Sequence, residues 1–168
     1  MKNTRMVLVL CTLAALGVAA YSQTAGRPAD VQALKDNEAR WNREYASKDF
    51  EKVVAHYADN AVVMAPGMAP ASGRDEIRKV LQEMLDDPAL SLKFQASRVE
   101  VASSGDLGFT QGSYQMTMTD PASKQVIHDH GSYVTTYRKQ PDGSWKAVAD
   151  IASSEAPPSS PSSTVAQK

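Results

Sequence analysis

The sequence predicts an α+β domain in which three N-terminal helices are followed by one curved antiparallel sheet. Between residues 30 and 85, apolar side chains recur at helical spacing. Between residues 92 and 153, apolar and polar residues alternate with period two, and short turns interrupt them. The alternation changes parity between Ala96 and Val99, which indicates a β-bulge and therefore a bent sheet. Such a sheet wraps its concave face around the helices as an open cone, with a pocket at the mouth.

The first helix is expected from Asp30 to about Ser47. Its apolar stripe contains Val31, Leu34, Trp41 and Tyr45, with Glu38 in the middle. Two interpretations of Glu38 are open. In the favoured one the carboxylate sits at the edge of the stripe and reaches water, because glutamates are rarely buried without partners. In the other it is a cavity acid near Trp41.

The segment from residue 49 to 85 reads as helix, strand, loop and helix. Asp49 is expected to cap the second helix, and Asp59-Asn60 to end it. The apolar positions of that helix are Phe50, Val53, Val54 and Tyr57. A short strand is expected over 61–64. The third helix is predicted to start at Ser72, with Asp75 as its capping-box partner.

Four long strands are predicted after the helices. They span residues 92–101, 107–119, 125–139 and 144–153. The turns between them are rich in Gly, Pro, Asp and Ser. Long strands joined by short turns are typical of an antiparallel meander.

Both ends of the chain differ from the domain at 30–154. Residues 1–22 resemble a signal peptide, because two basic residues precede an apolar run at 6–20 and small residues follow. The run is shorter than the about 20 residues of a membrane span, so no stable membrane insertion is expected after cleavage. Residues 23–29 read as a linker, and the Ser/Pro-rich residues 155–168 as a flexible tail. The sequence therefore predicts an exported protein, periplasmic or secreted.

Composition excludes several classes of function. The single cysteine, Cys11, lies in the predicted signal peptide, so the mature chain would have no disulfide and no thiolate ligand. The chain carries 18 basic and 19 acidic residues, and this balance does not favour nucleic acid as a partner. The chain contains no metal, nucleotide or catalytic-triad motif, so no cofactor and no metal site are expected.

Two passages resemble a known family. "KDFEKVVAHYADNAVVMAPGMAPASGRDEIRKVL" and "YRKQPDGSWKAVAD" are similar to SnoaL-like, ketosteroid-isomerase-like proteins of the nuclear transport factor 2-like superfamily. The resemblance covers about residues 30–154. It implies the cone-shaped nuclear transport factor 2-like fold, with three helices packed in the concave face of a curved, mostly antiparallel sheet. It implies no single activity, because this fold hosts isomerases, cyclases, dehydratases, epoxide hydrolases and non-catalytic association domains.

The working residues of a ketosteroid isomerase do not carry over. By the resemblance, its aspartate base would fall at Ala65, its oxyanion tyrosine at Trp41, and its protonated aspartate near Thr135. Alanine cannot abstract a proton, and the indole N–H is a donor but not an acid. A steroid isomerase of the known mechanism is therefore not expected.

Asp150 is the first candidate for a catalytic base. If Thr135 faces the cavity, as the resemblance implies, strand alternation turns Tyr133 and Tyr137 inward as well. Hairpin pairing with an equal-length turn then places Val148 and Asp150 on the cavity side. SnoaL-like cyclases resemble this arrangement in using a late-strand aspartate as base. In the alternative interpretation, Asp150 is structural and hydrogen-bonded to a tyrosine or a backbone N–H. Tyr133 or Trp41 would donate to a developing oxyanion. The expected ligand-binding residues are Trp41, Tyr45, Tyr57, Met64, Met68, Thr135, Tyr137 and Val148. For the methionines, an ordinary place in the core is the favoured alternative.

His128 and His130 could form part of a metal site, because alternate strand residues share one face. A third ligand would have to come from elsewhere, such as His56. Strand parity points both histidines away from the cavity, so solvated or interface histidines are favoured over a metal site. Together with Trp145 on the presumed outer face, they suggest a homodimer.

Three functions follow from these residues. The domain could bind a small hydrophobic molecule without reacting, or catalyse proton transfer on a small apolar carbonyl compound with Asp150 as base. It could also be a homodimeric association module with a vestigial cavity. The sequence favours a cavity protein and leaves catalysis open.

Overall fold

Three helices and six strands make up the computed structural model, which describes residues 28–121 and 123–155. The elements in chain order are α1 (Pro28–Ala46), α2 (Phe50–Val54), β1 (Tyr57–Met64), β2 (Ala71–Ser72), α3 (Arg74–Asp86), β3 (Ser91–Val101), β4 (Leu107–Thr119), β5 (Val126–Lys139) and β6 (Trp145–Ser154). The predicted signal peptide and all but the first residue of the predicted tail lie outside the described residues. None of the described helices is long and apolar enough to cross a membrane.

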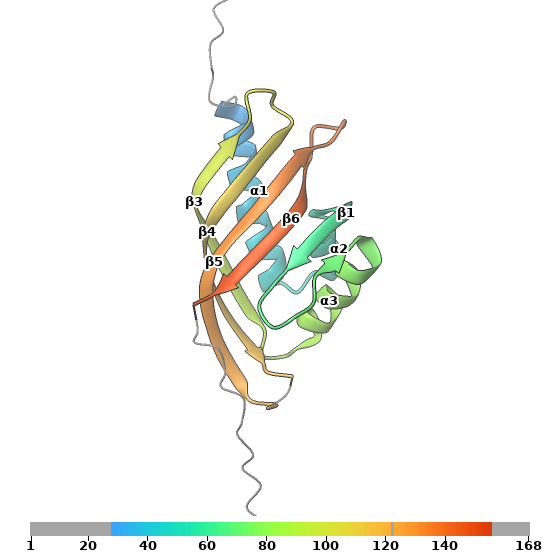
Figure 1. Cartoon of the computed structure of the whole chain (residues 1–168), viewed down its shortest axis with the longest axis vertical. Coiled ribbons are helices and arrows are strands. Elements are labelled where there is room, and N and C mark those ends of the chain that lie inside the picture. Colours follow the sequence, from blue (N-terminus) through green and yellow to red (C-terminus); the bar gives the residue numbers. More distant parts are fainter. Residues whose placement is uncertain (1–27, 122, 156–168) are drawn as a thin grey trace, which may run out of the picture.

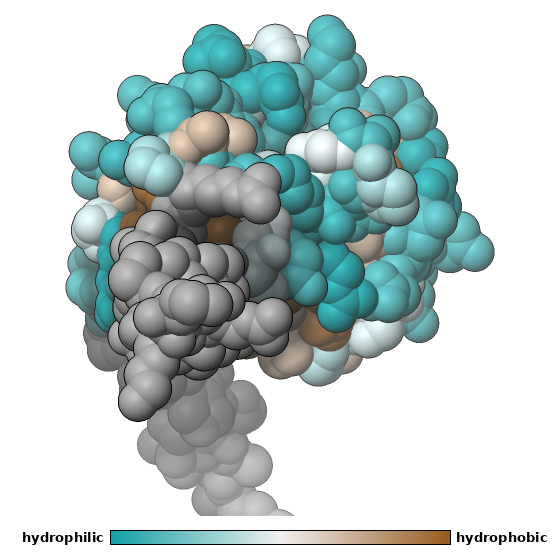
Figure 2. All heavy atoms as spheres, turned by 90° about the horizontal axis from the view of Figure 1, so that it is seen from above, coloured by the Kyte–Doolittle hydropathy of each residue, from teal (hydrophilic) through white to brown (hydrophobic). Residues whose placement is uncertain are grey.

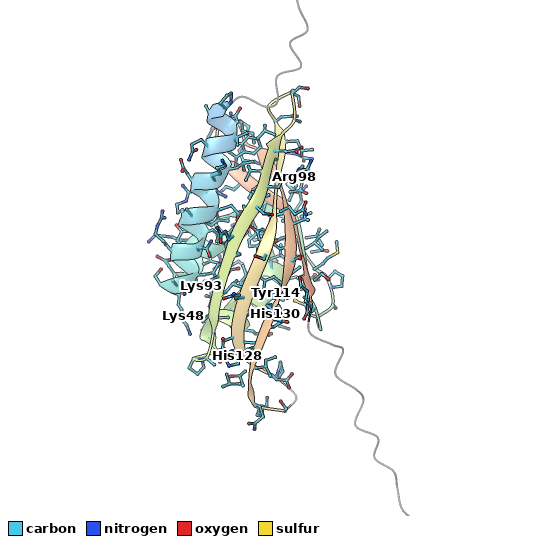
Figure 3. The ribbon with its side chains drawn as sticks, turned by 90° about the vertical axis from the view of Figure 1, so that its left-hand side faces the viewer. Lys48, Lys93, Arg98, Tyr114, His128 and His130 are labelled. Atoms are coloured by element: carbon cyan, nitrogen blue, oxygen red, sulfur yellow. The ribbon has the colours of Figure 1, made fainter. Side chains whose placement is uncertain are left out.

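The six strands form one mixed sheet in the order β2-β1-β6-β5-β4-β3 (Figure 1). The predicted antiparallel meander of β3, β4, β5 and β6 is confirmed. The sheet also contains β1, which pairs in parallel with β6, and β2, which pairs with β1. The sheet curves, and α1 packs along its concave face beside β3 (Figure 3).

The predicted bulge in β3 is confirmed, because the register with β4 shifts between Ala96 and Arg98. At this bend the backbone of β3 comes close to Gly112 of β4. A Cβ atom at Gly112 would lie 1.9 Å from the carbonyl oxygen of Gln95, so no larger residue fits without moving the strand. The bulge and this glycine together allow the sheet to curve around the helices.

The sequence Gly-Ser-Tyr occurs twice, and the two copies face each other in the sheet. Gly112 of β4 pairs with Tyr133 of β5, and Tyr114 pairs with Gly131. Each tyrosine therefore lies opposite a residue without a side chain, which leaves room for its ring on the concave face. The repeat reflects two neighbouring strands of similar shape.

The second helix is shorter than expected. Asp49 caps α2 as predicted, since its side chain accepts a hydrogen bond from the Lys52 backbone N–H (3.4 Å). The helix ends at Val54, however, and Tyr57 is the first residue of β1. The backbone N–H of Ala147 in β6 donates to the carbonyl oxygen of His56 (2.8 Å). Pairing with β6 thus outweighs the helical periodicity of this segment.

The predicted start of the third helix is wrong by two residues. Ser72 belongs to β2, and α3 begins at Arg74 with Gly73 as its N-cap. No side chain caps the helix; instead the backbone N–H of Ser72 donates to Glu76 (2.8 Å). The first helix also starts earlier than expected, at Pro28, a residue suited to a first helical position.

A second bulge lies in β6, and sequence reasoning missed it. Thr136 pairs with Ala149 and Tyr137 with Ala147, so Val148 is an extra residue that leaves the ladder. The bulge reverses the parity of the start of β6. Trp145 is therefore buried in the core rather than on the outer face, and its predicted position is wrong.

The core lies between the concave face of the sheet and the helices. Its fully buried side chains include Leu34, Val53, Ile77 and Tyr137. Seen from above, the described part of the surface is mostly hydrophilic with small hydrophobic patches (Figure 2). The exposed large apolar residues are Met64, Leu107, Val126, Ile127, Val134 and Ile151.

Candidate ligand-binding cavity

A cavity of about 130 Å³ lies between α1, α3 and the concave face of the sheet. Its walls are mainly apolar and include Val63, Met68, Leu81, Met84, Leu92, Phe94 and Met116. The polar groups among the lining residues are a carboxylate, a threonine hydroxyl, an indole N–H and the tyrosine hydroxyls. An apolar hollow with a few polar groups is typical of small-molecule sites.

An aromatic cluster centred on Trp41 forms one wall of the cavity. The Trp41 ring stacks on His56 with centroids 4.6 Å apart, and it meets Tyr57 edge-on at 5.1 Å and Phe94 at 5.8 Å. Tyr45 stacks beside it at 6.2 Å. Because contacts hold the indole on several sides, its orientation is set before any ligand arrives.

The Asp150 carboxylate faces this cavity and is held by two hydroxyls. The Tyr57 hydroxyl donates to Oδ2 (2.8 Å) and the Thr135 hydroxyl donates to Oδ1 (2.8 Å). The positions follow from strand pairing, since Asp150 of β6 pairs with Val63 of β1 and with Thr135 of β5. Both sequence interpretations of Asp150 therefore agree with the geometry: it lines the cavity and it is bonded to a tyrosine.

Burial raises the pKa of Asp150 above its ordinary value, and the negative charge of Glu38 adds to this rise. The hydrogen bonds from Tyr57 and Thr135 act in the opposite direction and only partly offset it. A carboxylate whose pKa is raised toward neutrality is a stronger base than an exposed one, as proton abstraction requires.

Glu38 is buried in the core, so the expectation that it reaches water is wrong. Only 5% of the residue is exposed. Its carboxylate accepts three hydrogen bonds of 2.6 Å, from the hydroxyls of Thr110, Tyr133 and Tyr137. These hydroxyls come from β4 and β5, which face α1 across the core. The periodicity of the helix could not reveal them, because they lie about 70 to 100 residues further along the chain.

The hydroxyl of Tyr133 is engaged by Glu38 and is not a free donor. Burial and the negative charge of Glu38 raise the pKa of Tyr133 and of Tyr137 well above the usual tyrosine value. Tyr133 therefore presents its ring to the cavity, while its hydroxyl keeps its proton and donates it in a hydrogen bond to Glu38.

Trp41, which lines the cavity, has an indole N–H without a partner. Its Nε1 is buried and has no hydrogen-bond partner within the described ranges 28–121 and 123–155. Within the same ranges, the Nε1 of Trp145 and the amide nitrogen of Asn37 are also buried without partners, and these two residues do not line the cavity. A buried donor without a partner costs stability. The residues around the cavity thus include one with an unpaired donor, Trp41, and one with a perturbed carboxylate, Asp150.

Most predicted ligand-binding residues line the cavity, namely Trp41, Tyr45, Tyr57, Met64, Met68 and Thr135, together with Asp150 and Tyr133. Two do not, and their predicted position is corrected. Tyr137 is fully buried against Glu38, and the β6 bulge turns Val148 toward a separate cleft. Sequence reasoning also missed Leu92 and Phe94 as lining residues, although their alternation marked the inner face of the strand.

The histidines of β5 lie on the outer face of the sheet, as expected. His128 and His130 are exposed near one end of the strand (Figure 3). His56, the third residue considered, is buried and lies 2.5 Å from the Glu44 carboxylate. No group of three or more His, Cys, Asp or Glu side chains in the described part of the chain is arranged to hold a metal ion.

The SnoaL-like domain family matches residues 39–148, nearly the whole of the folded domain. The chain belongs to the SnoaL-like family. No curated protein matches it. The resemblance of the sequence to this family, and the nuclear transport factor 2-like fold that the resemblance implies, are thereby confirmed.

Solved structures support the same assignment. A ketosteroid isomerase-like protein from Erwinia carotovora atroseptica is 25% identical, with a TM-score of 0.63, over 74% of this chain and 96% of that one. A provisionally assigned calcium/calmodulin dependent protein kinase II association domain from Xanthomonas campestris is 24% identical (TM-score 0.59; 84% and 100% covered). A provisionally assigned dehydratase of the NTF2-like family from Streptomyces avermitilis is 18% identical (TM-score 0.59; 75% and 96% covered). The last two likenesses show the shared fold alone.

Proposed function

We propose that this SnoaL-like protein is exported to the periplasm or the medium, where it binds a small hydrophobic molecule in its cavity. The observation that carries the proposal is an apolar cavity lined by Trp41, whose indole N–H is unpaired among the described residues, and by Asp150, whose pKa is raised by burial. Its volume suits one small ring, since an engineered apolar cavity of about 150 Å³ binds benzene. The methionines of the wall can adapt to the outline of the ligand.

The two polar groups favour a ligand that carries a carbonyl. The Trp41 N–H would donate to the carbonyl oxygen, and the Asp150 carboxylate would lie beside an adjacent carbon. Catalysis would then be a proton transfer: Asp150 takes a proton from that carbon, the charge moves to the oxygen, and Asp150 returns the proton at another carbon. This chemistry needs no cofactor. It differs from the ketosteroid isomerase mechanism because Trp41 stands where a tyrosine would act.

Native mass spectrometry of protein recovered from the periplasm or medium tests both parts of the proposal. We expect a mass that lacks about residues 1–22, and an additional mass of a retained small molecule that is lost on denaturation. A full-length mass would contradict cleavage of the signal peptide, and absence of the protein from both fractions would contradict export. Two results together would contradict the cavity proposal: the recovered protein carries no small molecule, and it does not bind the apolar probe in the titration described next.

Blocking the cavity should abolish binding without unfolding the domain. Ala152 lines the cavity and Ala149 lies on the same strand outside it. Ala152→Phe is expected to weaken binding of toluene, a neutral one-ring apolar probe, at least tenfold, because the phenylalanine ring occupies the space that the probe needs. Ala149→Phe is the matched control and should bind as the wild type does. Equal affinity of all three proteins, measured by isothermal titration calorimetry, would place the probe elsewhere.

A homodimer is the second candidate, and the outer face of the sheet favours it. Val134 of β5 and Ile151 of β6 pair there and are 39% and 43% exposed. Small side chains, Ser132 and Ser153, form the next pair along the strands, so a second copy could approach closely. Multi-angle light scattering should give the mass of a dimer for the wild type and of a monomer for Val134→Glu. A monomeric wild type at micromolar concentration would reject the dimer.

A further inference from the structure

A second hollow, of about 430 Å³, lies on the other side of Tyr57 from the cavity. Two strand irregularities create it. From Tyr57 to Val62, β1 advances by five residues, while β6 advances only from Ala147 to Ala149. The surplus residues of β1, from Ala58 to Asn60, leave the ladder and line the hollow, which we call the basic cleft. The bulged Val148 of β6 lines it as well. Bulges at such places are typically functional features of a sheet.

Four cationic side chains line the basic cleft, and two of them are neutralised. Arg74 bonds Asp59 through Nε (2.9 Å). Arg78 forms a two-pronged pair with Glu51, with Nη1 3.0 Å and Nη2 2.6 Å from its carboxylate oxygens. Both ion pairs lie in the wall of the cleft and carry no net charge. The net positive charge of the cleft therefore comes from the remaining two cations.

The remaining cations, Arg138 and Lys146, lie directly opposite each other on β5 and β6. Like charges at such positions destabilise a sheet. Lys146 donates to the carbonyl oxygen of Ala55 at the end of α2, and in the part of the chain that the structure describes Arg138 makes no side-chain hydrogen bond or ion pair. The neighbouring carboxylates, Asp106 and Asp142, are bonded to serines and form no ion pair with either cation. These hydrogen bonds lower the pKa of both carboxyl groups, and the nearby charges of Arg138 and Lys146 add to this, so each cation is only partly compensated.

We propose that the basic cleft binds a small molecule that carries an oxyanion, a phosphate or a carboxylate, between Arg138 and Lys146. The guanidinium offers parallel N–H donors that match two oxygens of either group. The amide of Asn60 also lines the cleft, and no side-chain hydrogen bond engages it among the described residues. Val54 and Val148 provide apolar wall for the carbon part of the ligand.

An anion at this position would relieve the repulsion between two cations that the fold holds side by side. The strand pairing fixes them, because each lies within a ladder and not in a loop. The cleft is distinct from the apolar cavity, so its occupation does not depend on the proposal for that cavity. Tyr57 lies between the two and lines both.

Titration with inorganic phosphate and with succinate, at low ionic strength, tests the proposal. In two-dimensional NMR spectra, we expect saturable shifts of the Ala58 to Asn60 and Lys146 amides and of the Arg138 side-chain Nε–H. Tighter binding of phosphate would identify a phosphate group as the natural one, and tighter binding of succinate a carboxylate. No saturable shift with either anion would overturn the proposal.

Charge-matched variants separate a built site from general attraction. Arg138→Gln with Lys146→Gln should weaken binding at least tenfold. Lys93→Gln with Lys124→Gln removes the same charge from exposed positions outside the cleft and should leave the affinity within about twofold. Equal weakening in both pairs would overturn the proposal.

A single variant covers the case in which the double variant does not fold. Asn60→Asp adds a carboxylate to the cleft at an exposed position and should abolish binding while the circular dichroism spectrum stays unchanged. Retention of wild-type affinity in a folded Asn60→Asp protein would also overturn the proposal.

Discussion

Glu38→Ala is expected to lower the free energy of unfolding by about 4 kcal/mol. The substitution leaves the hydroxyls of Thr110, Tyr133 and Tyr137 in the core without their acceptor, and each stranded group costs about 1–3 kcal/mol. It also opens a small void beside α1. The three groups together would cost about 3–9 kcal/mol. Removal of one partner from a buried charged network typically costs about 3–5 kcal/mol, and the expected value lies in the overlap of the two ranges. Urea unfolding followed by tryptophan fluorescence measures the change.

Two further variants serve as controls for Glu38→Ala. Glu38→Gln keeps the shape and one carbonyl acceptor, so it should lose about half as much stability. Glu83→Ala removes an exposed glutamate from α3 and should change the free energy of unfolding by no more than about 0.5 kcal/mol. A loss below about 1 kcal/mol for Glu38→Ala would contradict the hydrogen-bonded arrangement that the structure shows.

Asp150→Asn is expected to make the protein more stable at neutral pH. Because burial raises the pKa of Asp150 in the folded state, the folded protein binds a proton that the unfolded chain has already released. Stability is therefore highest below the unfolded pKa, near 4, and falls as the pH rises through the folded pKa. Asparagine stays neutral throughout, so the variant should lack this fall. Unfolding by urea at several pH values from 3 to 8 measures the difference.

Asp142→Asn is the control with the opposite sign. Hydrogen bonds from Ser144 lower the pKa of Asp142, so its contribution is present above the unfolded pKa and is lost as the pH falls. This variant should therefore lose stability at neutral pH. If Asp150→Asn instead proved less stable than the wild type at pH 7, the hydrogen bonds of Asp150 would outweigh its burial. Asp150 would then be a structural residue, and its role as a base would be rejected.

The architecture of the second half of the chain could be predicted because its signals are local. The bounds of β4 coincide with the predicted strand, and the parity change between Ala96 and Val99 marked the bulge in β3. Once the resemblance had placed Thr135 on the inner face, pairing across the short hairpin placed Asp150 there too. Each of these features depends on residues close together in the sequence.

Features that depend on distant partners could not be predicted. Tyr57 fits the helical stripe of its segment, but it pairs with Ala147 of β6 and is therefore the first residue of β1. The bulge at Val148 shows no change in the apolar pattern, and it displaced both Val148 and Trp145 from their expected faces. Glu38 can be buried because hydroxyls from β4 and β5 donate hydrogen bonds to its carboxylate. The sequence of the helix alone does not indicate these partners.

The pairing of β1 with β6 joins the two halves of the sheet through the last strand of the described chain. Within residues 28–121 and 123–155, β1 and β2 reach the meander through β6, and Asp150 occupies its place only when that strand is present. During synthesis from the N-terminus, the ribosome must therefore release the end of the domain before the site can exist. Completion of the sheet depends on β6, and binding can begin only after that strand has been synthesised.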